Sequence, residues 1–543
     1  MALFSKYKHF LLVILLGLFA SWPLLHIGLI PTHDGEYHLI RFFEFDKMLR
    51  AGYLYPRWAP DLDFSYGLPL FTFVYPLPNY VASLLHLFGA SFLDSVKLVM
   101  VVSTLFGGLF FYLWTEKFWG RLGALVSTTL YLFAPYRFVD IYVRGSVGEV
   151  MALGVFPGFL WTYTQYITSK KPVYVVASAI FLALTIFSHN ILGLMFFVFT
   201  IFYMTLLIIT SQQKKSLTVS SLFILLFSLG LSAIFWLPAL FETQFVRGLQ
   251  VYNIAQNFPD LSQLLLPSWG SGFFDSNGGD AMSTQIGLAN IFVIIISCIV
   301  LAKLWRKKQE KKPFLIFSLL CLAVLVFFML PISLFFWQTI PLIHYFQFPW
   351  RLLSLVILLC SFLAGSVMLL KPSKPLAIIL IAIAILTTYS YTQPAYYMVR
   401  TDSYYTLRSN FIDGTNSPGN IFDTIWNTTK SARSKERFPV QNGLYVTDLH
   451  FLSPVNFSAR TNTLANIQQS VALSFFPGWQ VTVDGKVITV FPSKNGQLSF
   501  LLPKGNHTVH IFLVQTFLEE IAQYVSLLTA LILILFLLRK RQK

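Results

Sequence analysis

The sequence predicts an α-helical polytopic membrane protein that carries a small extracytoplasmic β-sandwich domain. Of its 543 residues, 56% are hydrophobic and 11% are charged, and the mean hydropathy is +0.66. A soluble domain of this length could not expose so apolar a surface to water. Apolar runs long enough to cross a bilayer recur along the chain, whereas residues 393–517 alternate polar and apolar residues.

The apolar runs predict about twelve transmembrane helices. They lie at residues 9–30, 95–115, 122–135, 150–168, 172–189, 191–211, 217–240, 285–304, 313–334, 351–370, 375–392 and 518–538. The first run lacks a small-x-small cleavage site, so we interpret it as a retained helix and not as a signal peptide. The chain then divides into a transmembrane domain (1–392), a β-rich domain (393–517) and a C-terminal helix with a basic tail (518–543).

The positions of the Lys and Arg residues indicate how the chain is oriented in the membrane. The net charge is +16, and with a cytoplasmic N-terminus the compact basic clusters all lie on the cytoplasmic side: TEKFWGR, TSKKP, SQQKKS, RKKQEKKP, KPSKP and the tail RKRQK. We therefore expect both termini in the cytoplasm and the long connections outside, among them 31–94, PYRFVDIYVRGSVGE and 393–517. No basic face is interleaved with aromatic residues, so nucleic acid is not an expected partner. The three cysteines all lie in apolar runs, which excludes a disulfide framework and a cysteine metal site.

The first external loop, residues 31–94, is predicted to contain two helices. HLIRFFEFDKMLRAG has the apolar spacing of a helix that lies in the membrane interface and ends at Gly52. LFTFVYPLPNYVASLLHLFG is interpreted as a juxtamembrane or re-entrant helix. A full span is the alternative, but it would invert every later loop and place the basic clusters outside.

The β-rich domain is predicted from period-two alternation. SVALSFFPGWQVTVDGKVITVF, QLSFLLP and HTVHIFLV alternate, and turns are expected at Asp484-Gly485, Asn495-Gly496 and Lys504-Gly505. Trp479 heads one strand and is expected inside the sandwich. The domain has no nucleophile or acid pair in sequence, so we expect it to bind or pack and not to catalyse.

The stretch PTHDGEYHLIR is the most unusual feature near the membrane. It presents His33, Asp34, Glu36, His38 and Arg41 directly after the first apolar run. An extended segment would place Asp34 and Glu36 on one side, whereas a helix would place Asp34 and His38 together. Asp34 could also serve only as the N-cap of the interfacial helix.

Several motifs together resemble a known family. HDGEYH, AGYLYPRWAPDLDFSYGLPLF, YPLPNY, VRGSVGE, SHN and FQFPWR are similar to the bacterial membrane family labelled 6-pyruvoyl-tetrahydropterin-synthase-related, which is grouped with the GT-C superfamily of glycosyltransferases. FFPGWQVTVDGK and LPKGNHTV resemble the C-terminal β domain of YfhO-type membrane proteins. The pterin label implies no pterin chemistry here, because no zinc-site pattern of such a synthase is present.

The resemblance implies a GT-C-like fold and an inverting transfer of a sugar. The donor would be a polyprenyl-phosphate sugar, and the acceptor an envelope glycan, lipid or protein outside the cytoplasm. In the superfamily an acid of the first external loop is the base; the matching residue is Asp34, with Glu36 as second candidate, orienting group or metal ligand. A carboxylate can deprotonate the acceptor hydroxyl, and a guanidinium can stabilise the departing phosphate.

Candidate substrate-binding residues lie in the same motifs. They are His38, Arg57, Arg144, Glu149, His189 and Arg351. Arg351 could instead be an interfacial anchor, and Arg144 and Glu149 could simply pair with each other. No cofactor is firmly expected. A divalent cation held by His33, Asp34, Glu36 and His38 is an alternative, although their spacing is not a recognised ligand pattern.

Two other functions compete with glycosyl transfer. A transporter or flippase of an envelope precursor would show charged or broken positions inside several helices. The sequence predicts ionisable groups crowded at the outer face and nearly absent from helix interiors, which favours surface chemistry. A catalytically inactive scaffold is the third reading.

Overall fold

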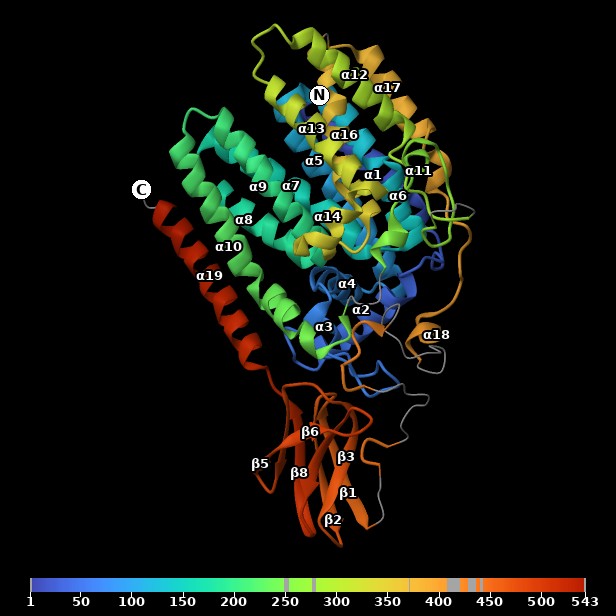
Figure 1. Cartoon of the computed structure of the whole chain (residues 1–543), viewed down its shortest axis with the longest axis vertical. Coiled ribbons are helices and arrows are strands. Elements are labelled where there is room, and N and C mark those ends of the chain that lie inside the picture. Colours follow the sequence, from blue (N-terminus) through green and yellow to red (C-terminus); the bar gives the residue numbers. More distant parts are fainter. Residues whose placement is uncertain are drawn as a thin grey trace.

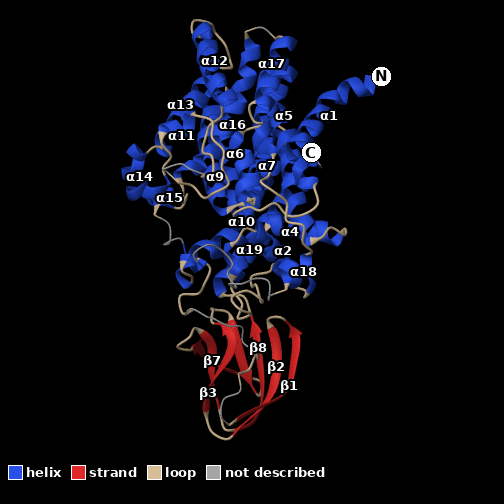
Figure 2. Cartoon of the chain, turned by 90° about the vertical axis from the view of Figure 1, so that its right-hand side faces the viewer, coloured by secondary structure: helices blue, strands red, loops and turns tan. Residues whose placement is uncertain are grey.

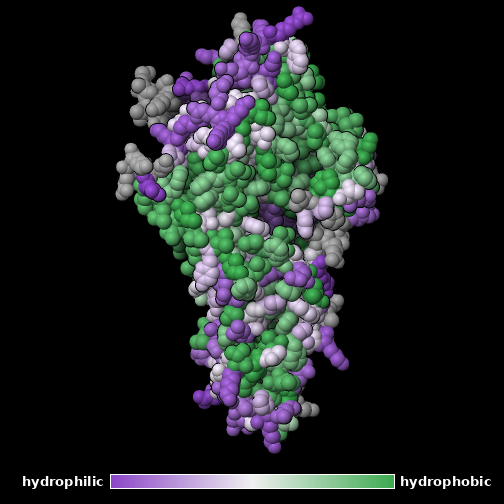
Figure 3. Space-filling view, turned by 60° about the vertical axis from the view of Figure 1, so that its left-hand side comes forward, coloured by the Kyte–Doolittle hydropathy of each residue, from purple (hydrophilic) through white to green (hydrophobic). Residues whose placement is uncertain are grey.

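The computed structural model describes residues 2–248, 253–275, 280–370, 372–407, 420–427, 436–439 and 443–541. It has a long helical body with a β domain at one end (Figures 1 and 2). The two ends of the chain lie on the helical body, away from the β domain. Hydrophobic residues cover much of the helical body, and hydrophilic residues gather at its end farthest from the β domain (Figure 3).

Each apolar run that was expected to span is helical. The long helices are α1 (Ala2–Ser21), α5 (Phe92–Leu132), α7 (Val147–Ser169), α8 (Pro172–Ser188), α9 (Asn190–Thr210), α10 (Lys214–Phe241), α12 (Leu288–Leu304), α13 (Lys312–Met329), α16 (Leu353–Ala364), α17 (Lys374–Leu386) and α19 (Phe517–Arg541). Among the described residues, 7 helical stretches are long and apolar enough to cross a membrane, and α8, α12 and α17 are shorter apolar helices. The polytopic helical class is therefore confirmed.

Helix α5 consists of two legs that fold back on each other. Gly120 has φ 69°, a left-handed conformation that interrupts the helix. A straight helix would separate Phe111 from Tyr131 by about 30 Å, yet their ring centroids are 4.2 Å apart. The legs correspond to the two predicted spans on either side of TEKFWGR.

The first external loop contains the interfacial helix α2 (Gly35–Arg50) and the short helices α3 (Leu70–Phe73) and α4 (Leu77–Leu87). With 11 residues, α4 covers about 16 Å, roughly half of the hydrocarbon thickness. The full-span alternative is therefore wrong. The polar side of α2 is solvated only in part: Arg41 and Glu44 are buried, whereas Lys47 is partly exposed and Arg50 is exposed.

The β domain is a sandwich of two antiparallel sheets. Its strands are β1 (Leu444–Ser453), β2 (Asn456–Thr463), β3 (Ile467–Ser474), β4 (Trp479–Val483), β5 (Lys486–Ile488), β6 (Val490–Pro492), β7 (Gln497–Leu502) and β8 (Gly505–Leu513). The sheets have the orders β1-β2-β8-β4-β5 and β3-β7-β6. Asp484-Gly485 closes the β4–β5 hairpin and Asn495-Gly496 lies between β6 and β7, whereas Lys504-Gly505 carries the chain from one sheet to the other.

The core of the sandwich is shared with the first external loop. Trp479 is buried, as predicted, and its ring meets Trp58 edge-on at 5.3 Å. Asp63, also in the loop, accepts hydrogen bonds from Asn427 (2.9 Å) and Ser474 (3.0 Å). The β domain is thus packed against the loop that carries PTHDGEYHLIR.

The stretch PYRFVDIYVRGSVGE, expected to be an external connection, joins α5 to α7 and is buried in the protein instead of forming a solvated loop. It forms α6 (Pro135–Phe138), a π-helical turn η2 (Val139–Arg144) and the start of α7, and all of these residues are buried. Three of its charged side chains, Asp140, Arg144 and Glu149, pair with one another inside the bundle. The remaining short helices are α11 (Leu261–Leu265), α14 (Leu334–Thr339), α15 (Pro341–His344) and α18 (Asp402–Thr406).

Candidate functional site

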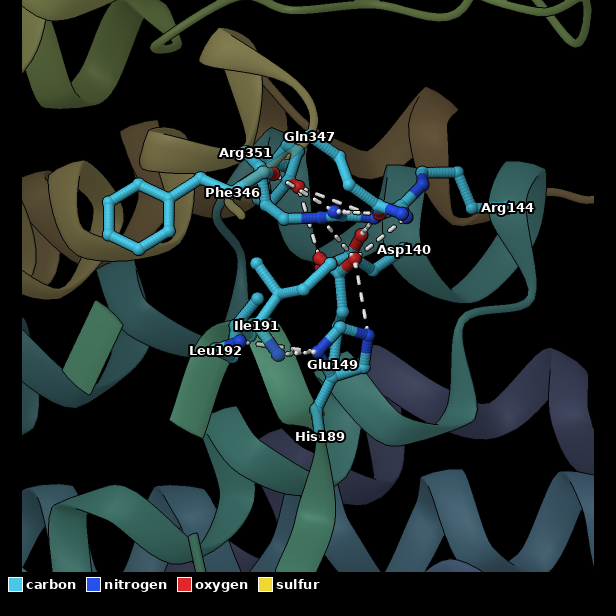
Figure 4. Close-up of polar contacts among 10 residues, drawn as sticks. Asp140, Arg144, Glu149, His189, Ile191, Leu192, Phe346, Gln347 and Arg351 are labelled. Carbon is cyan, nitrogen blue, oxygen red and sulfur yellow. Dashed lines mark hydrogen bonds and ion pairs between the residues drawn. The ribbon is translucent and has the colours of Figure 1, made fainter. Parts of the chain in front are cut away.

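Glu149 lies at the centre of a buried ion cluster (Figure 4). Its side chain is fully buried, and its Oε1 atom accepts hydrogen bonds from Arg144 Nη2 at 2.7 Å and Arg351 Nε at 2.9 Å. The hydroxyl of Tyr136 donates to Oε2 at 3.2 Å. One carboxylate therefore holds two guanidinium groups that come from segments about 200 residues apart.

Arg144 is held from several sides by its own segment. Asp140, one turn earlier on η2, accepts from Arg144 Nη1 at 2.6 Å, and the guanidinium lies 4.9 Å from the centre of the Trp350 ring. Gly145 follows with φ 65°, and a Cβ there would collide with Thr32. Glycine therefore lets the chain turn into α7 while the first external loop approaches closely.

Arg351 enters the cluster from a 3₁₀ turn, η7 (Pro349–Leu352), that precedes α16. Its Nη1 atom donates to Gln347 Oε1 at 2.7 Å and to the carbonyl of Phe346 at 3.1 Å. The side chain is buried and does not act only as an interfacial anchor. Both arginines are thus oriented by several hydrogen bonds, which fixes their positions before any ligand arrives.

His189 occupies the break between α8 and α9. Its Nδ1 atom accepts from the backbone N–H groups of Ile191 and Leu192, both at 3.2 Å. An accepting Nδ1 requires the neutral tautomer with hydrogen on Nε2, and Nε2 lies 3.9 Å from Glu149 Oε1. The ring also faces Tyr75, whose centroid is 4.9 Å away.

Asp34 lies next to this cluster through the backbone. The N–H groups of His33 and Asp34 donate to the carbonyls of Val143 and Arg144, at 3.0 and 2.9 Å. Asp34 occupies the N-cap position of α2, but its side chain makes no capping hydrogen bond and is partly exposed. Its carboxylate is therefore not used to cap the helix, unlike in the capping alternative.

His38, one turn after Asp34 on α2, is buried. Its ring lies 6.3 Å from that of Tyr75, which links it to His189 on the other side of the same tyrosine. Burial and the nearby Arg41 lower the pKa of His38 well below its usual value. His38 therefore belongs to the wall of the site as a neutral ring.

Glu36 and His33 face different surroundings. The pKa of Glu36 is raised by burial, with Arg400 acting in the opposite direction. His33 stacks on Phe273 at 4.3 Å, and its Nε2 atom lies 3.0 Å from the carbonyl oxygen of Ser271. Burial lowers the pKa of His33.

These positions do not suit the divalent-cation alternative. Within the described part of the chain, no group of three or more His, Cys, Asp or Glu side chains gathers as a metal site. The four residues considered from sequence are spread over two sides of the start of α2.

Arg57 lies in a different polar cluster. Its Nε atom is 3.3 Å from Glu519 Oε1, and its Nη2 donates to the carbonyl of Ile234 at 3.1 Å. These contacts connect the first external loop to α19 and α10. The structure therefore does not bring Arg57 together with the other candidates.

Residues 71–397 match the model of a family described as 6-pyruvoyl-tetrahydropterin synthase related domain, membrane protein. The chain belongs to this family. An uncharacterised protein of Lactococcus lactis subsp. cremoris (strain MG1363) is 23% identical over 345 residues, which cover 61% of this chain and 55% of that protein. The chain thus spans about half of the length of this Lactococcus protein.

One solved structure aligns with a large part of this chain. The crystal structure of ArnT from Cupriavidus metallidurans, bound to undecaprenyl phosphate, aligns with 70% of this chain and 63% of its own at 15% identity, with a TM-score of 0.41. A superposition this partial carries no inference about activity in this family member, which must be argued from its own residues.

Sequence reasoning singled out Arg144, Glu149, His189 and Arg351, and the structure gathers all four. It missed Asp140, whose position four residues before Arg144 is a helical ion-pair spacing and could have indicated the pair. Tyr75, Gln347 and Trp350 carried no signal of their own, because their roles depend on contacts between distant segments.

Proposed function

We propose that this protein is a membrane glycosyltransferase that moves a sugar from a polyprenyl-phosphate donor to an extracytoplasmic acceptor. The observation that carries the proposal is the pair of backbone hydrogen bonds that join His33 and Asp34 to Val143 and Arg144. The backbone of Asp34 is thus next to that of Arg144, which supports assigning its partly exposed carboxylate and the two guanidinium groups to one site. The motifs that resemble the GT-C superfamily, HDGEYH and FQFPWR among them, supply these residues.

The proposed reaction is a single displacement with inversion. Asp34 accepts the proton of an acceptor hydroxyl as its oxygen attacks the anomeric carbon of the donor. The bond between that carbon and the phosphate oxygen breaks, and the electron pair leaves with the polyprenyl phosphate. Arg144 and Arg351 stabilise the charge that develops on the departing phosphate. The new glycosidic bond and one proton on Asp34 balance the step.

Glu149 and His189 position the arginines and do not meet the reacting atoms. Glu149 accepts from both guanidinium groups through one oxygen, which keeps the two cations adjacent despite their mutual repulsion. His189 faces the same oxygen while its other nitrogen begins α9. Glu36 lies toward Arg400 and remains the second candidate for the base.

We further propose that the β-domain end is extracytoplasmic and that both termini are cytoplasmic. The hydrophilic end of the helical body opposite the β domain agrees with the basic clusters of the sequence (Figure 3). Cysteine labelling from outside should modify Asn420→Cys and leave Gln309→Cys unmodified. The reverse pattern would place the site on the cytoplasmic side and contradict the proposal.

One observation favours a transporter as the second candidate. Asp140, Arg144 and Glu149 are buried in the helical body, in a π-helical turn and in the first turn of α7. Buried charges next to irregular helices also mark transport sites. The two functions differ in whether a covalent bond of the lipid is broken.

The test is an assay of the purified chain in nanodiscs and in vesicles with a panel of labelled polyprenyl-phosphate sugars. We expect transfer of label to an acceptor, or donor hydrolysis when acceptor is absent. Movement of intact labelled lipid across the vesicle membrane without bond cleavage would instead establish the transporter. If neither transfer nor lipid movement occurs with any donor, the inactive scaffold is the remaining alternative.

A further inference from the structure

Gln347 occupies a tight turn directly before η7. Its backbone has φ 64°, in the left-handed region that residues with a Cβ rarely adopt. The N–H of Phe348 donates to the carbonyl of Phe346 at 2.7 Å, so the chain reverses within three residues. A hydrogen bond of this kind across a residue with positive φ forms the rarer and strained class of γ-turn. Strain of this kind persists where the surrounding structure holds it, often at a ligand site.

The turn presents two acceptors to Arg351. Its Nη1 atom donates to Gln347 Oε1 at 2.7 Å and to the carbonyl of Phe346 at 3.1 Å. The Nε atom of the same guanidinium donates to Glu149 Oε1 at 2.9 Å. Figure 4 shows Gln347 and His189 on opposite sides of these ion pairs. Gln347 therefore borders the buried ion cluster on the side away from His189.

The contact with Arg351 determines the orientation of the Gln347 amide. A guanidinium can only donate hydrogen bonds, so the amide oxygen must be the atom that faces it. The NH2 group is then left for another partner, and Nε2 makes no hydrogen bond to a described residue. The side chain of Gln347 is only partly buried. Two N–H donors thus remain available beside a cation that is already held in place.

Neither the turn nor the contact with Arg351 by itself requires glutamine. Glycine would adopt the positive φ without strain. A carboxylate at position 347 would accept from the guanidinium more strongly than an amide does. What glutamine adds is a pair of donors without a negative charge. This combination suits a site that binds an anion, because a carboxylate there would repel the ligand.

We propose that Gln347 is a substrate-binding residue: its Oε1 atom holds Arg351 while its NH2 group donates a hydrogen bond to a non-bridging phosphate oxygen of the lipid-linked donor. This inference rests on the proposed function, because the ligand is the polyprenyl-phosphate sugar. Arg351 contributes to the same phosphate through Nη2, from which no described residue accepts a hydrogen bond. The turn thus supplies a neutral donor next to a charged one.

The experiment measures binding of two probes to the full chain in nanodiscs of zwitterionic lipid: a polyprenyl methyl phosphodiester and the neutral polyprenol. Gln347→Met keeps the length of the side chain but removes the amide. We expect it to weaken binding of the phosphodiester by about tenfold to a hundredfold, the effect of one hydrogen bond to a charged group. Binding of polyprenol should not change. Gln468→Met is the matched control, because Gln468 is exposed on β3.

A second variant distinguishes a direct contact from an effect transmitted through Arg351. If Gln347 acts only by orienting the guanidinium, Gln347→Met should cost nothing further in the Arg351→Met background. A direct contact predicts that Gln347→Met still weakens binding of the phosphodiester in that background. Should Arg351→Met not fold, or lose its preference for the phosphodiester, Arg351→Lys takes its place, since lysine keeps the charge without the planar guanidinium.

The outcomes separate the two proposals. If the wild-type chain binds the phosphodiester no better than polyprenol, the lipid-phosphate function fails and this inference fails with it. If the wild type prefers the phosphodiester but Gln347→Met binds it equally well, the function stands and the role of Gln347 is refuted. A loss that disappears once Arg351 is replaced would also refute the direct contact, because Gln347 would then only position the arginine.

Discussion

Glu149→Gln is the substitution whose effect on stability follows most directly from the structure. The change keeps the size of the side chain but removes the charge that holds Arg144 and Arg351 together at 2.7 and 2.9 Å. With the amide oxygen in the place of Oε1, both guanidinium groups keep an acceptor but lose its negative charge, and the amide nitrogen replaces Oε2, which accepts from Tyr136. Two buried cations would then face each other without their shared anion. Breaking a buried ion pair in this way costs about 3–5 kcal/mol.

Thermal unfolding of the purified chain, followed by loss of tryptophan fluorescence in the same detergent, measures this effect. Glu116→Gln is the matched control, because Glu116 pairs with the exposed Arg121 at 3.4 Å and such a surface pair contributes about 0–1 kcal/mol. We expect Glu149→Gln to lower the melting temperature by many degrees and Glu116→Gln to change it little. Equal melting of the two variants would refute the central place of Glu149 in the cluster.

Three further outcomes are expected. Arg351→Ala should weaken donor binding, measured as a higher KM for the lipid-linked sugar with a smaller change in kcat, and a change in kcat alone would argue against a phosphate contact. Residues 393–517 expressed alone should give a strand-rich circular dichroism spectrum. They should melt less cooperatively than the same fragment supplied with the Trp58 segment, because Trp58 completes their core. Identical melting of the two samples would show that the β domain folds independently. The hydrogen bond that His507 donates to Asp484 raises the pKa of His507, so the stability that His507 contributes is present below its usual pKa and is lost as pH rises through the raised value. The difference in melting temperature between wild type and Asp484→Asn should therefore shrink from pH 6 to pH 9, and a constant difference would contradict this.

Helices and strands were largely predictable because their signals are local. Apolar runs of about 20 residues identify spans by length alone, and the fold-back at Gly120 coincides with the polar link TEKFWGR. The alternation in the β domain predicted the strands from β3 onward and two of its three turns, but not β1 and β2. The crossing at Gly505 between the two sheets was not predictable, because a Lys-Gly turn does not reveal which sheet receives the next strand.

The sequence predicted which residues form the candidate site better than it predicted their burial. VRGSVGE carries two charged residues and three Gly or Ser residues, a composition typical of an exposed loop. Arg144 and Glu149 are nevertheless buried, because Arg351, about 200 residues later, completes their charge balance. Long-range pairing of this kind leaves no periodic signal. Arg57 shows the opposite case, since its motif lies in the first external loop but its partner Glu519 draws it toward the last helix.

The most direct test of the account compares Asp34→Asn with the wild type on a working donor and acceptor pair. Asparagine keeps the size of the side chain but cannot take the proton, so turnover should fall by about 100 to 10,000-fold with little change in melting temperature. Glu36→Gln should have an intermediate effect, and Asp448→Asn, an exposed site in the β domain, should have none. Near-wild-type turnover of Asp34→Asn would contradict the catalytic assignment, and loss of activity in Glu36→Gln alone would move the base two residues along the chain.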